Sequence, residues 1–163
     1  MAAVRATEAR HIVTDAAASG PGIMLYAGAE AITPELLSIV IPRPTDGWDI
    51  SLELGRADLA VLTAVKISAN TDAGIRLVAI EPDGDQREKA QAFLRGVQET
   101  ARLRDAAFEV VGELESARGE GGRSLHIYPV GPDTPFERLH ESSSQLGGTC
   151  LFTVDSGSES ALA

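Results

Sequence analysis

Hydrophobic positions recur at two different spacings along the chain, and each spacing predicts one kind of element. Residues 49–54 alternate strictly between apolar and polar side chains, which is typical of a strand with one buried face. Residues 85–104 instead place apolar side chains three and four positions apart, which predicts a long amphipathic helix. Short apolar runs with few charges predict further strands at 23–26, 59–68, 75–80, 108–114, 125–130 and 150–154.

The strongest local signal for a helix start lies at residues 33–41. Thr33 is a suitable cap, Pro34 takes the first helical position, and Glu35 favours the positive end of a helix dipole. Apolar residues follow, and Pro42 would end the helix. We therefore expect a helix over 33–41, with further helices over 2–18 and 135–145.

These expected elements define a fold class. About six or seven strands interleave irregularly with about three or four helices, without strict strand–helix–strand units. The pattern predicts an α+β fold, in which helices pack on a single mixed sheet. Since the chain has 163 residues and no long linker, we expect one domain over residues 1–155 and a flexible tail over 156–163.

The charge balance makes nucleic acid an unexpected partner. The formal net charge is -10, and only 14 residues are Lys or Arg, without a basic stripe among aromatic residues. Binding to phosphate backbones requires clustered basic side chains. The charge is better explained as a contribution to solubility.

Three further features predict a cytoplasmic protein without a membrane partner. No apolar run approaches the roughly 18–20 residues that span a bilayer. The first residues lack the apolar core of a signal peptide. Cys150 is the only cysteine, which excludes an internal disulfide and fits a reducing compartment.

Four segments, taken in order, resemble 3,4-dihydroxy-2-butanone 4-phosphate synthase of the riboflavin pathway. They read GPGIMLY from Gly20, AEAITPELLSIVI from Ala29, VLTAVKISANTDAGI from Val61, and HIYPV from His126 with the RLHESSSQLGG and CLFTVDSGS that follow it. The resemblance implies the fold of that family and a homodimer. In the family, a long acidic loop with most of the catalytic carboxylates precedes the AE pair; here that connection is very short.

The same resemblance implies a catalytic cluster late in the chain. Arg138 and His140 are similar to the family's arginine and metal-binding histidine, although they lie one residue closer together, and Glu141 follows directly. His140 and Glu141 are thus expected to be catalytic, with Arg138 as an anion contact. Magnesium is implied by resemblance only. Because one histidine and one glutamate make a poor magnesium site, we expect no metal and no cofactor.

Three more residues are candidates for substrate binding. Thr71 and Asp72 stand where the family has a Thr-Thr-Gly turn, but such residues also commonly bond their own backbone. Arg123 ends the Gly-rich stretch GEGGR, which suits either an anion contact or a flexible hairpin.

Three residues outside the resemblance are left with open roles. His126 is either a pocket residue or a hydrogen-bonded structural histidine. Cys150 is expected in the core. Trp48 suits a stacking surface or an interface.

Two functions are compatible with these observations. The first is a diverged lyase-like or isomerase-like enzyme that acts on a small hydroxylated or phosphorylated metabolite, without the family's own reaction. The alternative is a non-catalytic metabolite-binding or accessory protein on the same scaffold.

Overall fold

The computed structural model describes residues 33–45, 47–48, 57–118, 123–131 and 133–154, together with the backbone of residues 22–26. Its elements in chain order are β1 (Gly22–Tyr26), β2 (Leu36–Pro42), α2 (Ala57–Thr71), β3 (Gly74–Ile80), η1 (Gly84–Gln86), α3 (Arg87–Thr100), β4 (Ala107–Val111), η2 (Leu114–Ala117), β5 (Ser124–Val130), α4 (Phe136–Leu146) and β6 (Thr149–Val154).

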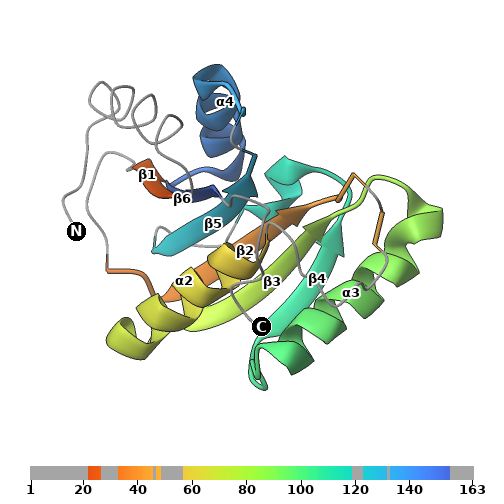
Figure 1. Ribbon diagram of the computed structural model, residues 1–163, viewed down its shortest axis with the longest axis horizontal. Helices are drawn as coiled ribbons and strands as arrows, with labels where there is room; N and C mark the ends of the chain where they lie inside the picture. The colour runs from red at the N-terminus through yellow and green to blue at the C-terminus, as the bar shows by residue number, and fades with distance from the viewer. Residues whose placement is uncertain are drawn as a thin grey trace.

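The strands form one sheet in the order β1-β6-β5-β2-β3-β4 (Figure 1). Strands β2 to β6 run parallel to their neighbours, and β1 pairs antiparallel with β6. Each of α2, α3 and α4 connects two adjacent parallel strands. The described part of the chain is therefore built from repeated βαβ units.

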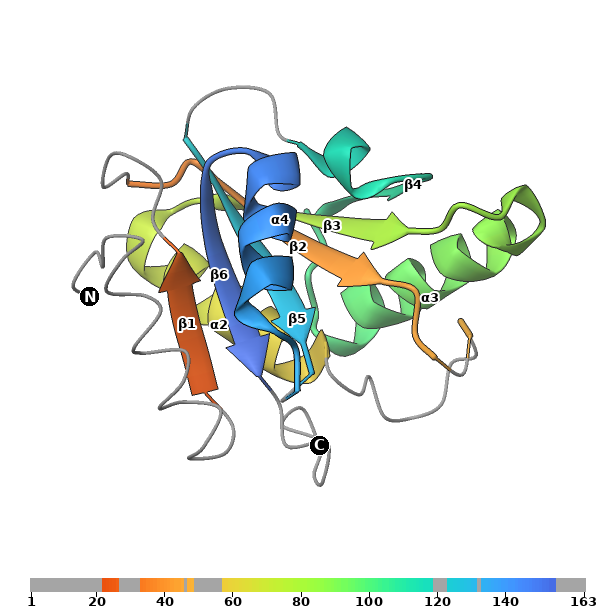
Figure 2. The ribbon, with the colours of Figure 1, turned by 90° about the horizontal axis from the view of Figure 1, so that it is seen from above.

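Helices cover both faces of this sheet (Figure 2). On one face, α2 and α3 bury a core that includes Leu37, Ile39, Leu77 and Ile127. On the other face, α4 and η2 cover a smaller core that includes Phe152. A central parallel sheet with helices on both sides is the α/β arrangement.

The fold-class prediction is thus confirmed only in its coarser part. A mixed sheet with packed helices is present, but the α+β assignment and the irregular interleaving were wrong. The error came from two segments, 33–41 and 59–68, whose helix and strand assignments were exchanged.

The first exchanged segment is β2, which was expected to be a helix. Five consecutive residues from Leu37 to Ile41 are buried, so apolar side chains are needed on both faces of the strand. Branched residues suit such a central position. Glu35, expected in the first turn of that helix, instead joins two strand starts: its N–H donates to the Arg123 carbonyl, and its own carbonyl accepts from the Gly74 N–H. Tertiary pairing thus overrode a good local helix signal.

The second exchanged segment is α2, where a strand was expected. Its face toward the sheet is formed by the small or branched residues Ala57, Ala60, Val61 and Ala64. The remaining positions also include apolar residues, among them Leu59, Leu62 and Val65. Because apolar side chains occur around the whole helix, the helical period was hidden in the sequence.

The other described elements agree with the sequence. Strands expected at 23–26, 75–80, 108–114, 125–130 and 150–154 correspond to β1, β3, β4, β5 and β6, and the helices expected at 85–104 and 135–145 correspond to α3 and α4. The expected helix over 2–18, strand over 49–54 and tail over 156–163 lie outside the described residues. The boundaries of the single domain stay a prediction.

An arginine that is distant in the sequence binds the C-terminal end of α4. Arg118, just after η2, donates to the Ser144 and Gln145 carbonyls at 3.1–3.3 Å. These are among the carbonyls that a helix leaves without partners at its end. The chain then turns at Gly147, whose φ is 65°.

Gly147→Ala is expected to destabilise the protein by about 1–2 kcal/mol. A Cβ at this position would lie 2.9 Å from Arg118 Nε, and the backbone conformation is one that L side chains avoid. Urea unfolding measures the effect. Gly84→Ala is the matched control, because a Cβ there meets nothing within 4 Å. Equal effects of the two substitutions would contradict this account.

Candidate functional site at the carboxyl edge of the sheet

The sheet has a switch in its winding between β2 and β5. The helix after β2 lies on one face of the sheet, and the helix after β5 lies on the other (Figure 2). In open α/β sheets, ligand sites commonly form at the carboxyl ends of strands beside such a switch. The segment after β2 adjoins this switch, and the residues that follow β3, the other neighbour of β2, lie at the same edge of the sheet.

A buried carboxylate occupies this edge. Glu81 directly follows β3, and its side chain is 0% exposed. One carboxylate oxygen accepts from Trp48 Nε1 at 2.5 Å, and the other accepts from the backbone N–H of Asp83 at 2.8 Å. The longer ion pair to Arg43, which directly follows β2, measures 3.4 Å.

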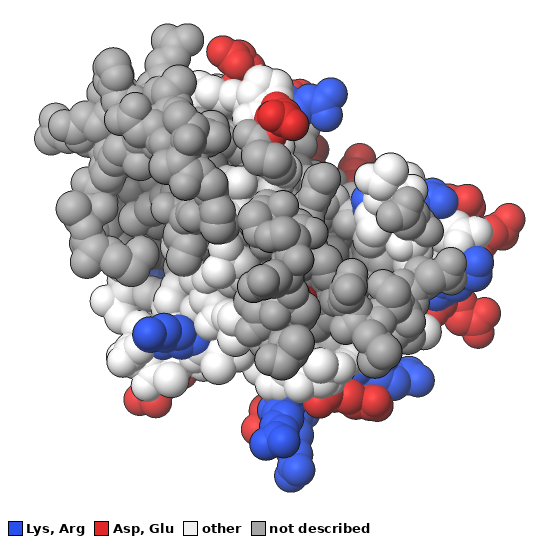
Figure 3. Space-filling view, in the orientation of Figure 1, with Lys and Arg blue, Asp and Glu red and all other residues white. Residues whose placement is uncertain are grey.

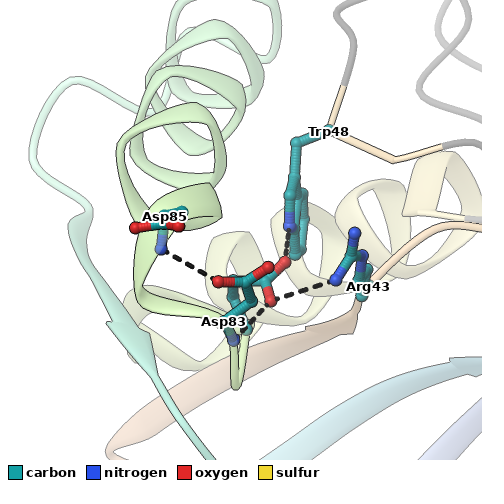
Figure 4. A network of polar contacts seen from close by, with 5 residues as sticks. Arg43, Trp48, Asp83 and Asp85 are labelled. Atoms are coloured by element: carbon teal, nitrogen blue, oxygen red, sulfur yellow. Dashed lines mark hydrogen bonds and ion pairs between the residues drawn. The ribbon is translucent and has the colours of Figure 1, made fainter.

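Figure 4 shows how these groups converge from separate parts of the chain. Arg43 and Trp48 come from the segment after β2, while Asp83 and Asp85 come from the turn before α3. Asp83 extends the network, since its carboxylate accepts from the Asp85 N–H at 3.0 Å. The network therefore joins the loops at the carboxyl ends of two neighbouring strands.

The tryptophan anchors the network in the core. Trp48 is 3% exposed and meets Phe93 of α3 edge-on, with ring centroids 5.3 Å apart. The sequence left two roles open for Trp48, a stacking surface or an interface. The buried ring instead fills the space between its loop and α3. A buried indole N–H needs an acceptor, and Glu81 supplies one.

The hydrogen bonds to Glu81 indicate a structural role for this carboxylate. Burying a carboxylate is costly unless it is hydrogen-bonded, and here both oxygens have donors. Since Arg43 is partly exposed and distant, it adds little to that balance. The arrangement is suited to fixing two loops in place, with Glu81 as the shared acceptor.

A second polar group of residues crosses the other face of the sheet. Paired positions in neighbouring strands place Cys150, His126, Ser38 and Arg76 in one row. Arg76 donates to Ser38 Oγ at 3.2 Å, to Glu109 at 2.9 Å and to the Ala117 carbonyl at 2.7 Å. Arg76 thereby ties η2 and β4 to the middle of the sheet.

His126 is the least satisfied member of this row. His126 is 1% exposed, and neither nitrogen of its ring has a hydrogen-bond partner of normal geometry within the described residues. The pKa of His126 is lowered from 6.5 to about 4, mainly by burial and next by the positive charge of Arg76, with a smaller effect from Arg118. The nearby Gly147 backbone opposes this shift without overcoming it.

Cys150 is a core residue, as the sequence predicted. Burial raises the pKa of its thiol to about 11, although a hydrogen bond with Ser143 acts in the opposite direction. A thiol with a raised pKa is a poor nucleophile.

The structure separates the predicted site residues into two groups. Arg138, His140 and Glu141 lie exposed in the first half of α4, after the carboxyl end of β5. Their catalytic and binding roles stay predictions.

Thr71, Asp72 and Arg123 lie at the opposite edge of the sheet, before the starts of β3 and β5. The Thr71 hydroxyl donates to its own helix at the Ile67 carbonyl, 2.9 Å away, as turn residues commonly do. Arg123 is exposed and forms an ion pair with Glu35 at 2.5 Å. These contacts leave the predicted substrate-binding roles untested.

Sequence reasoning missed Glu81 and Arg43. One signal was present, since the strand at 75–80 and the Pro-Asp-Gly turn after it place Glu81 at a strand end. The helix expected at 33–41 hid the parallel neighbour that brings Arg43 beside it.

No candidate metal centre occurs in the part of the chain that the structure describes, since it holds no group of three His, Cys, Asp or Glu side chains suited to a metal ion. None of its helices is long and apolar enough to cross a membrane. The prediction of no cofactor is not tested by these observations.

The fold and this edge define a doubly wound α/β domain with an added antiparallel edge strand. Residues 34–162 match the family model described as "Prokaryotic cation-chloride cotransporter, C-terminal domain, 2nd". The chain belongs to this family.

A solved structure supports the assignment. The crystal structure of the cytoplasmic domain of a prokaryotic cation chloride cotransporter has a TM-score of 0.77 and 28% sequence identity with this chain. The likeness covers 96% of this chain and 61% of that one. No curated protein sequence matches. The predicted cytoplasmic location is confirmed by this likeness, because the matched structure is a cytoplasmic domain.

These comparisons overturn the resemblance to dihydroxybutanone phosphate synthase. With it fall the riboflavin-pathway and lyase assignments, the enzyme acting on a small metabolite, and the alternative of a metabolite-binding or accessory protein on that scaffold. The physical reason is visible in two segments. The stretch taken for the family's helix is β2, and the stretch taken for a strand leading to a turn is α2.

The partner predictions change accordingly. A small-molecule metabolite has no support from the family, and the expectation of no membrane partner conflicts with membership of a cotransporter family. The homodimer rested on the overturned resemblance and stays a prediction without that support.

Trp48→Phe is expected to lower the free energy of unfolding by about 1–3 kcal/mol, because the buried Glu81 carboxylate loses its shortest hydrogen bond. Urea unfolding measures this cost, and a double-mutant cycle isolates its cause. In a Glu81→Leu background the same substitution should cost clearly less. Equal costs in both backgrounds would show that the hydrogen bond does not stabilise this edge.

The low pKa of His126 predicts loss of stability in acid. Since the folded state has a pKa of about 4 against 6.5 for the ordinary group, the unfolded chain binds the proton first as the pH falls. Stability from the neutral histidine is present above pH 6.5 and decreases between pH 6.5 and pH 4, by about 3 kcal/mol in total.

Unfolding free energies of the wild type and His126→Gln, measured at several pH values across this range, test the point. The variant should show a shallower decrease, since it no longer takes up the His126 proton on unfolding. Identical pH slopes for the two proteins would refute the assignment.

Proposed function

We propose that the chain forms part of the cytoplasmic C-terminal domain of a cation-chloride cotransporter and acts by contacting other parts of that transporter. The family match over residues 34–162 carries this proposal. The function is regulatory, and the membrane-bound part of the same transporter is the principal partner.

The geometry of the carboxyl edge supports a role in protein contacts. In a doubly wound domain the loops at this edge would ordinarily surround a ligand. Here Trp48 and Glu81 fill the space after β2 and β3 and bind the two loops to each other. A rigid edge of this kind suits a domain that presents fixed surfaces to a neighbouring protein.

The direct test is transport by the cotransporter that contains this chain. Chloride-dependent rubidium uptake is measured in vesicles that hold either the intact transporter or the transporter without residues 34–154. We expect the deletion to change the uptake rate or its dependence on internal ions severalfold at equal transporter content. Identical uptake under all ionic conditions would contradict a regulatory role.

A cross-linking measurement locates the contact. The sequence has two lysines, Lys66 and Lys89, which lie exposed on α2 and α3, on the same face of the sheet. An amine-reactive cross-linker applied to the intact transporter should join this face to its neighbour. Lys66→Arg and Lys89→Arg variants identify which helix is involved.

A further inference from the structure

The sheet ends at β4 among the described strands, and the backbone groups of an end strand are available for pairing. Successive residues of a strand direct these groups to opposite sides. The Val111 carbonyl accepts from the Glu81 N–H, on the side of β3. Val110 and Phe108 stand one and three positions before Val111, so their backbone groups point to the other side, away from β3.

Two side chains of α3 occupy this outer edge. Arg87 donates from Nη2 to the Val110 carbonyl at 2.5 Å. Gln98 donates from Nε2 to the carbonyl of Ala106, directly before β4, at 2.9 Å. Since the two donors stand near opposite ends of α3, they engage carbonyls at both ends of the strand.

The sequence of β4 explains why such protection matters. It reads Ala-Phe-Glu-Val-Val, with aromatic and branched residues that favour strand pairing. A second copy of the chain offers the same short strand. Two copies of β4 placed antiparallel about a twofold axis would form a self-complementary pair.

We infer that Arg87 and Gln98 close the β4 edge against pairing with β4 of a second copy of this chain. An incoming strand needs the Ala106 and Val110 carbonyls as acceptors, and both side chains lie in its path. Displacing Arg87, which is exposed, would also strip water from its charge. Charged side chains at sheet edges hinder association in this way.

On the face seen in Figure 3, acidic and basic residues are interspersed in the region of α3, as on a solvated surface.

The test variant carries Arg87→Met and Gln98→Met, which keep side-chain length and remove the donors. The matched control carries Gln91→Met and Arg95→Met, which remove one glutamine and one arginine from exposed positions of the same helix. Light scattering across a concentration series measures the mass, and NMR hydrogen exchange measures protection of the Phe108 and Val110 amides.

The test variant should double the mass found for the wild type at high concentration and protect both amides at least tenfold. The control pair should match the wild type in mass and protection. No association, association without protection of these amides, or equal association of the control would each overturn the inference.

If the double variant does not fold, Arg87→Met alone leaves one donor in place. It should then associate at a higher concentration, with protection strongest at Val110. The inference does not depend on the proposed transporter function, because it concerns the isolated chain in solution.

Discussion

Burial of β2 on both faces is the constraint on which the rest of the arrangement depends. The strand stands between β3 and β5 and has no face toward water from Leu37 to Ile41. One face must be covered by α2 and α3, and the other by α4 and η2. The helices after β2 and β5 accordingly lie on opposite faces, and the carboxyl ends of the strands beside this change of side are where ligand sites commonly form.

At that edge the chain uses a buried charge to fix its loops. Glu81 accepts hydrogen bonds from a tryptophan that follows one strand and from a backbone amide beyond the next. Both loops are held because the carboxylate cannot lose either donor without a large desolvation cost. Such an anchor fits the role in protein contacts that we propose for this domain.

The sequence predicted correctly those elements whose hydrophobic pattern agrees with their burial in the structure. Helix α3 has amphipathic spacing because one of its faces is exposed to water. Strands β3, β5 and β6 are short apolar runs, and clear turns follow β3 and β5. The candidate site was less accessible to such reasoning. Glu81 lies 38 residues from Arg43 and 33 residues from Trp48 along the chain, and only parallel pairing of β2 with β3 brings them together.

The sequence by itself determined a sheet protein with amphipathic helices, a cysteine in the core and turns at the ends of several strands. Only the tertiary structure decided the states of residues 36–42 and 57–71, because apolar residues occur on more than one side of each segment and periodicity does not distinguish them. Strand pairing settled the first, since its backbone groups are satisfied by two neighbours. Close packing of alanines on the sheet settled the second. That exchange changed both the fold class and the family to which the chain is assigned.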